Sequence, residues 1–123
     1  MPDGPTFSSI ICRLEALLAR VNAEPGLGAF QAKLAHTLAK GDDRAVEGRD
    51  LCAASNAKKA TARLKQVERA VIQYAHRLSG LPARKKLDET LRQAFLAPAE
   101  RLRADTRTLR KDLHCPGEAS SPL

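Results

Sequence analysis

The sequence predicts an all-α protein, an up-and-down helical bundle of about four helices. Leucine, alanine, arginine and lysine, which favour helices, are abundant among the 123 residues. Apolar residues recur three or four positions apart over long stretches, which is the spacing of an amphipathic helix. No segment rich in Val, Ile and Thr alternates with the period of a strand. Short connections between the helices make successive helices antiparallel neighbours.

The first predicted helix begins within residues 6–9, where hydroxyl side chains can cap the free N–H groups, after a flexible start over residues 1–5. Pro25 and Gly26 end this helix, since both residues favour a turn. Its apolar stripe consists of Ile10, Leu14, Leu17, Leu18 and Val21.

The second predicted helix is a long one, over residues 28–54. Its stripe is Leu27, Phe30, Leu34, Leu38, Gly41, Ala45, Gly48 and Cys52. Gly41 weakens a helix by about 1 kcal/mol relative to alanine, and Asp42 could cap a new helix, so a break near Gly41 is the alternative. The unbroken spacing favours continuity, with the small residues allowing a neighbouring helix to approach closely.

The third predicted helix covers residues 57–79, after Ser55 and Asn56, which suit a helix end followed by an N-cap. Its stripe is Ala60, Leu64, Val67, Val71, Tyr74 and Leu78. This stripe begins with small residues and ends with large ones, whereas the second helix does the reverse. The two helices are therefore expected to form a long antiparallel hairpin at the centre of the bundle, ended by Gly80 and Pro82.

The fourth predicted helix covers residues 84–113 and contains Pro98, which predicts a kink or a restart there. Its stripe is Leu87, Leu91, Phe95, Leu102, Leu109 and Leu113. The bundle is expected to span residues 6–114, and residues 115–123 are expected to form a disordered tail.

The charge of the chain is unevenly distributed. The net charge is +7, but residues 1–56 hold six Lys and Arg against seven Asp and Glu, a net −1, whereas the remainder holds fifteen against seven, a net +8. Such a basic half is typical of a solvated helix surface or of a surface that binds nucleic acid or another polyanion. The candidate anion-binding residues are Lys58, Lys59, Arg63, Lys65, Arg69, Arg77, Arg84, Lys85, Lys86, Arg101, Arg103, Arg107, Arg110 and Lys111. Base readout usually needs stacking aromatic residues or a recognition helix, and neither is evident.

The stretch "KLAHTLAKGDDRAVEGRDLCAASNAKKATARLKQVERAVIQYAHRL" resembles FIMAH- and FIVAR-type domains, small helical modules near the C-termini of large secreted and cell-surface bacterial proteins. The shared pattern is a leucine-spaced helix, a short polar turn (here residues 55–60) and a second leucine-spaced helix, and the likeness covers residues 27–113. The resemblance implies an accessory role in spacing, attachment or interaction beside other domains of a parent protein. It also implies an extracellular or cell-surface location and supplies no catalytic residues.

The three cysteines, Cys12, Cys52 and Cys115, lack the CxxC spacing of a zinc or redox motif. They are either buried free thiols or one disulfide with a cysteine left over. The predicted helix lengths, at about 1.5 Å per residue, place Cys12 about 20 Å from Cys52 along the bundle axis. They place Cys115 about 15 Å from Cys52 in the opposite direction. Pairing Cys52 with Cys115 needs the smaller rearrangement, so that disulfide is expected, with Cys12 free. The oxidising compartment that it requires is implied by the resemblance.

No pattern in the sequence indicates an enzyme, a cofactor or a metal site. HExxH, phosphate-loop and GxSxG motifs are missing. His36, His76 and His114 are isolated, and the first two are expected at the edge of the core. No apolar stretch has the length of a membrane span, and the residues at the start do not resemble a signal peptide. The predicted function is a non-enzymatic structural or interaction module, and the alternative is a basic helical protein that binds nucleic acid or an anionic surface through the third and fourth helices.

Overall fold

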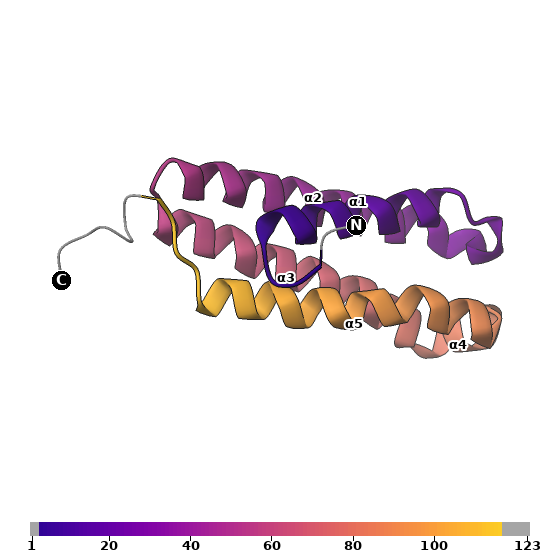
Figure 1. Cartoon of the computed structure of the whole chain (residues 1–123). Helices are drawn as coiled ribbons and strands as arrows, with labels where there is room; N and C mark the ends of the chain where they lie inside the picture. Colours follow the sequence, from indigo (N-terminus) through magenta and orange to yellow (C-terminus); the bar gives the residue numbers. More distant parts are fainter. Residues whose placement is uncertain (1–2, 117–123) are drawn as a thin grey trace.

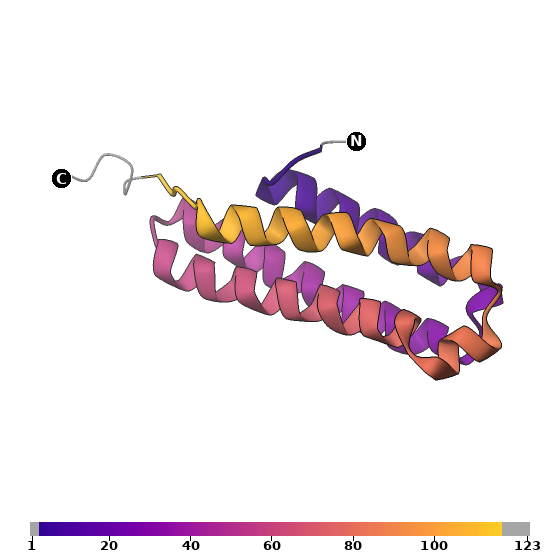
Figure 2. The ribbon, with the colours of Figure 1, turned by 90° about the horizontal axis from the view of Figure 1, so that it is seen from below.

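The computed structural model describes residues 3–116, and all of the regular secondary structure in this part of the chain is helical, without a strand. The elements are α1 (Phe7–Asn22), the 3-10 helix η1 (Pro25–Phe30), α2 (Gln31–Ala53), α3 (Ala57–Ser79), α4 (Leu81–Lys86) and α5 (Glu89–Lys111). Figures 1 and 2 show α1, α2, α3 and α5 side by side as an elongated bundle, with the short α4 at one end. The predicted all-α bundle is confirmed.

The first helix begins where the sequence places it. The Thr6 side chain accepts a hydrogen bond of 3.1 Å from the Ser9 N–H, as an N-cap residue should. The Arg13 side chain donates to the Gly4 carbonyl at 3.0 Å, so this part of the expected flexible start is bonded to α1. Residues 1 and 2 lie outside the described residues.

The second long helix begins at Gln31 rather than at residue 28, because η1 precedes it. Gly28 adopts φ 54° and ψ −132°, a conformation that interrupts any helix and suits glycine. The Gln31 side chain donates to the carbonyls of Val21, Asn22 and Glu24 at 2.9, 3.2 and 3.1 Å, which ties the connection to the end of α1.

The α2 helix is continuous through Gly41, as the spacing predicted, and its small residues face α3. A Cβ atom at Gly41 would lie 3.2 Å from Ala70 Cβ. A Cβ atom at Gly48 would lie 3.1 Å from Phe7 Cε1 and 3.3 Å from Arg63 Cβ. These distances are tighter than ordinary van der Waals contact, so the glycines let α2 and α3 lie close together, and a larger residue would require its neighbours to shift.

The turn between α2 and α3 is a Schellman motif built around Ser55, which has φ 65°. The Ser55 N–H donates to the Cys52 carbonyl and the Asn56 N–H to the Leu51 carbonyl, both at 2.9 Å. The Asn56 side chain then accepts from the Lys59 N–H at 3.1 Å and caps α3. The predicted hairpin therefore has a defined hydrogen-bonded turn.

The single helix predicted over residues 84–113 is wrong at its start. The chain forms α4 first and leaves helical geometry at Leu87, which has φ −100° and ψ 143°. The Asp88 side chain then accepts from the Leu91 N–H at 3.0 Å and starts α5. As a result α5 has 23 residues, the same length as α2 and α3.

Pro98 lies inside α5, and the restart considered there does not occur, because the helix continues to Lys111. The core between the helices is mostly aliphatic and also contains the buried side chain of Tyr74. The Tyr74 hydroxyl donates to the Phe95 carbonyl at 2.8 Å, and burial raises its pKa above the ordinary value. Within residues 3–116, no helix combines the length and the apolar character needed to cross a membrane.

Candidate anion-binding surface

The basic residues predicted as candidates for anion binding do not all lie in one region. Lys58 and Lys59 are exposed in the first turn of α3, beside the α2–α3 turn. Arg84, Lys85 and Lys86 are exposed on α4, at the opposite end of the bundle (Figure 1). The length of α3 separates these two groups by about 35 Å. These five residues therefore do not share one surface patch.

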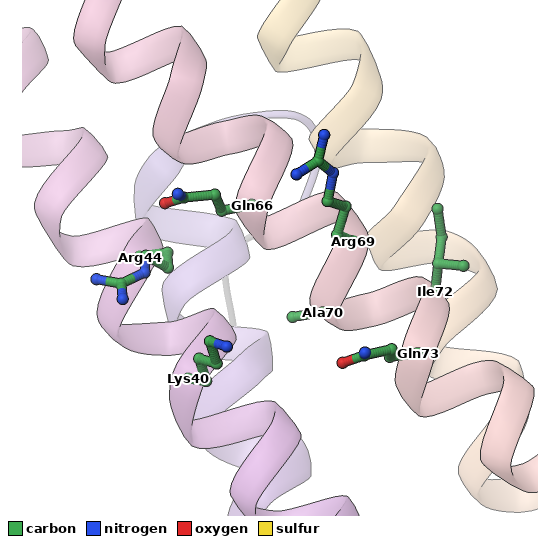
Figure 3. A pocket seen from close by; sticks show the side chains of 7 residues that line it. All are labelled: Lys40, Arg44, Gln66, Arg69, Ala70, Ile72 and Gln73. Atoms are coloured by element: carbon green, nitrogen blue, oxygen red, sulfur yellow. The ribbon is translucent and has the colours of Figure 1, made fainter.

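The central region has a groove between α2 and α3 with a volume of about 510 Å³. Its lining combines basic, amide and small apolar side chains: Lys40, Arg44, Gln66, Arg69, Ala70, Ile72 and Gln73 (Figure 3). Lys40 and Arg44 come from α2, and the other residues come from α3. Of the predicted anion-binding residues, this groove contains Arg69.

A second, smaller groove of about 250 Å³ lies between α3 and α5. It is lined by Lys65, Glu68, Arg69, Ile72 and Arg110. Arg69 therefore borders both grooves. Arg103 and Arg107 precede Arg110 on α5 at spacings of four and three residues. These three arginines therefore lie along one face of α5, the face that borders α3 at Arg110. We call Lys40, Arg44, Lys65, Arg69 and Arg110 the central cationic surface.

Ion pairs divide these cations into two kinds. Arg44 Nη1 donates to both carboxylate oxygens of Glu47 at 2.9 Å, and Arg63 Nε lies 2.9 Å from Glu47 Oε1 without pointing its N–H at that oxygen. Arg110 Nε is 2.9 Å from Glu68 Oε2.

Lys40, Lys65 and Arg69, in contrast, are exposed and have no ion pair within the described part of the chain. The remaining predicted cations lie elsewhere: Arg77 and Lys86 border a hollow near α4, and Arg101 lines a groove between α1 and α5. Lys111 is exposed in the last turn of α5.

The sequence reasoning missed Lys40 and Arg44. Both are on α2, where Asp42, Asp43 and Glu47 make the local charge nearly neutral. The available signal was their spacing of four residues, which places two cations on one face of a helix whose acids lie mostly on other faces.

At the α2–α3 turn, the structure joins Cys52 and Cys115 in a disulfide with a Cα–Cα distance of 4.9 Å, and Cys12 is a half-buried free thiol. This is the expected pairing. Two features remove the overshoot of about 15 Å given by the predicted helix lengths. The helix α5 begins five residues later than the predicted helix, which accounts for about 7 Å. The chain then leaves the helix after Lys111 and crosses to the α2–α3 turn (Figure 1).

The disulfide belongs to a small apolar cluster with Ala60, and Phe7, Leu51, Ala57 and Leu113 pack against it. The Ser55 hydroxyl also donates to the Pro116 carbonyl. The expected disordered tail is thus wrong for Cys115 and Pro116, and its other residues, 117–123, lie outside the described residues.

The histidines are on separate elements and do not converge. His36, His76 and His114 are all exposed, so the first two are not at the edge of the core as expected. Within residues 3–116, no three His, Cys, Asp or Glu side chains are grouped so that they could hold a metal ion.

A carboxyl group with altered acidity lies between α1 and α2. Burial raises the pKa of Asp42 from 3.8 to about 7, helped by a hydrogen bond and charge repulsion from Glu15 and by repulsion from Asp43. Asp42 Oδ1 is buried and has no hydrogen-bond partner elsewhere in residues 3–116. The Asp42 carboxyl group therefore keeps its proton in the folded protein at acidic pH, where an ordinary aspartate would be ionised.

Comparisons of the chain with models of known protein families, with curated proteins and with solved structures give no match.

Proposed function

We propose that this protein is a non-enzymatic interaction module that binds an anionic partner through the central cationic surface. The observation that carries the proposal is that Arg69 borders two grooves, one lined also by Lys40 and Arg44 and the other lined also by Lys65 and Arg110. Cations gathered on three adjacent helices produce a local positive potential, which attracts a polyanion and accelerates its association.

The setting that we propose is the cell exterior, where the chain would serve as an accessory domain of a larger protein. One observation supports this setting, the Cys52–Cys115 disulfide, since disulfides persist mainly in oxidising compartments. The proposal also follows the resemblance of residues 27–113 to modules of secreted bacterial proteins, which is a prediction from the sequence.

Retention on an immobilised sulfated polysaccharide such as heparin tests the proposal. The variant Lys40→Glu/Arg69→Glu changes two residues of the central cationic surface. Arg84→Glu/Lys85→Glu makes the same change of charge on α4 and serves as the control. We expect the first variant to elute at clearly lower salt than the control. Equal elution of the two variants would show that only the net charge matters and would contradict the proposed site.

A second candidate function is binding of a nucleic-acid backbone, and the groove between α3 and α5 is the observation that favours it. Lys65, Arg69 and Arg110 line this groove, and Arg103 and Arg107 extend the row of cations along α5. Phosphate contacts need only such cations and are weakened strongly by salt. Micromolar binding to random duplex DNA that collapses as salt rises, measured by gel shift, would favour this candidate over a protein or polysaccharide partner.

A further inference from the structure

The groove between α2 and α3 contains hydrogen-bonding groups that a purely electrostatic surface does not need. Figure 3 shows the side chains of Gln66 and Gln73 extending from α3 toward α2, and that of Lys40 extending from α2 toward α3. An amide side chain both donates and accepts hydrogen bonds, whereas a lysine ammonium only donates. The groove thus offers one ammonium group between two carboxamides.

The floor of the groove is fixed by the contact of α2 and α3. Ala70 lines the groove and lies opposite Gly41, where the two helices come close together because α2 has no side chain at this position. The walls combine basic and amide side chains with the apolar side chain of Ile72. The groove therefore offers a bound group both hydrogen bonds and apolar contact.

Arg44 is positioned so that it can exchange partners. Its guanidinium points away from the groove in Figure 3 and is bonded to Glu47. Glu47 is also within 2.9 Å of Arg63. If Arg44 turned to a ligand, Glu47 would keep a cationic partner, so the exchange would not leave an unpaired carboxylate.

We infer that this groove binds a phosphate ester group, with Lys40 holding the phosphate oxygens, Gln66 and Gln73 bonding the oxygens that neighbour the phosphate, and Arg44 and Arg69 turning in to close over the group. In Figure 3 the Arg69 guanidinium is directed toward α5, so Arg69, like Arg44, must change rotamer to reach the ligand. The three terminal oxygens of a phosphate ester can accept several hydrogen bonds at once, and arginine and lysine are the usual side chains that bind phosphate. The inference rests on the proposed function and specifies the chemical group that the surface recognises.

Titration of the isotope-labelled protein with sn-glycerol 3-phosphate, followed by NMR, tests the inference. We expect saturable shifts of the Gln66 and Gln73 side-chain amide signals. Lys40→Gln and Arg69→Gln should each weaken binding about tenfold, as expected for losing a charge-assisted hydrogen bond. The matched control Arg84→Gln, on α4, should leave the affinity unchanged. Equal weakening by all three variants would overturn the inference.

A salt control tests whether the shifts report binding of the phosphate group. Sodium chloride at the same ionic strength should not reproduce the shifts of the Gln66 and Gln73 signals. If it does, these signals respond only to ionic strength and the inference is wrong. Vesicles of phosphatidylcholine containing phosphatidic acid present the same phosphate group on a lipid. Tighter binding to the vesicles than to the soluble ester would identify a lipid headgroup as the source, and the reverse would identify a free ester.

The heparin column separates failure of this inference from failure of the proposed function. If the protein fails to bind glycerol phosphate but Arg69-dependent retention on heparin persists, then the phosphate site is wrong and the central cationic surface stands. If both are lost, the proposed function fails as well.

Discussion

The guanidinium of Arg20 donates a hydrogen bond of 3.4 Å to the Ala94 carbonyl. This carbonyl is the one that residue 98 would bond in an uninterrupted α-helix, and Pro98 has no N–H to donate. The Arg20 guanidinium also lies 4.8 Å from the centre of the Phe95 ring, which holds it against this turn of α5. A side chain of α1 therefore supplies a donor at the point where α5 lacks one.

A double-mutant cycle tests this relationship. Replacing Pro98 with alanine restores the backbone donor, so Arg20→Ala should destabilise the Pro98→Ala protein less than it destabilises the wild type. The coupling should be about 0.5–1.5 kcal/mol, the net contribution of one hydrogen bond. The contact with Phe95 is present in both backgrounds and cancels. Chemical denaturation measures the four free energies of unfolding, and an equal cost of Arg20→Ala in both backgrounds would contradict the relationship.

The disulfide between Cys52 and Cys115 is expected to stabilise the protein by about 2–4 kcal/mol, because it closes a long loop in the unfolded chain. The sequence separation of the two cysteines is 63 residues. Cys52→Ser/Cys115→Ser should lower the free energy of unfolding by this amount, while Cys12→Ser should have a much smaller effect. Non-reducing peptide mapping checks the pairing itself, and a linked peptide containing Cys12 would refute it.

Gly48→Leu should destabilise the protein by about 1–3 kcal/mol through overpacking. The new side chain would meet Phe7 and Arg63, since a Cβ atom alone at this position lies within 3.3 Å of both. Ala62→Leu is a suitable control, because Ala62 is exposed on α3. Thermal unfolding followed by circular dichroism compares the two variants, and similar melting temperatures would show that the helices can separate at Gly48 without cost.

The raised pKa of Asp42 predicts a pH-dependent stability. Burial and Glu15 raise the pKa from 3.8 to about 7, so the folded protein binds more protons than the unfolded chain between these values. The free energy of unfolding that Asp42 contributes therefore falls as the pH rises from about 4 to about 7. Asp42→Asn removes this dependence, and its gain in melting temperature over the wild type should increase across the interval.

The matched control for this prediction is Asp50→Asn, which changes an exposed carboxylate on the same helix. Its difference from the wild type should stay nearly constant over the same pH range. A constant difference for Asp42→Asn as well would mean that the carboxyl group is ionised in the folded protein at acidic pH, contrary to its surroundings.

The helical hairpin could be predicted because its signals are local and agree with one another. Apolar spacing continued through Gly41, and Ser55 and Asn56 provided the end of one helix and the cap of the next. The break before α5 was harder to predict, because Leu87 and Leu91 keep the apolar spacing across it. The cap at Asp88 was the contrary signal, and it outweighed the periodicity once α4 could turn across the end of the bundle.

The central cationic surface could be predicted only in part, because it depends on which helices become neighbours. Arg69 and Arg110 were recognisable as members of a basic half of the chain. The groove containing Lys40, however, exists because α2 and α3 pack closely at Gly41, and no local pattern shows that Lys40 lies opposite Gln73. Charge counting also overlooked Glu47, which binds two arginines at once.

The Schellman turn at Ser55 has a consequence for the order in which the chain folds. It joins two helices of 23 residues through residues 54–56, so the long α2–α3 interface forms after closure of a very short loop. Closing so short a loop loses little chain entropy, and contacts of low sequence separation speed folding. We therefore expect the α2–α3 hairpin to be largely formed in the transition state, with α1 and α5 docking onto it afterwards.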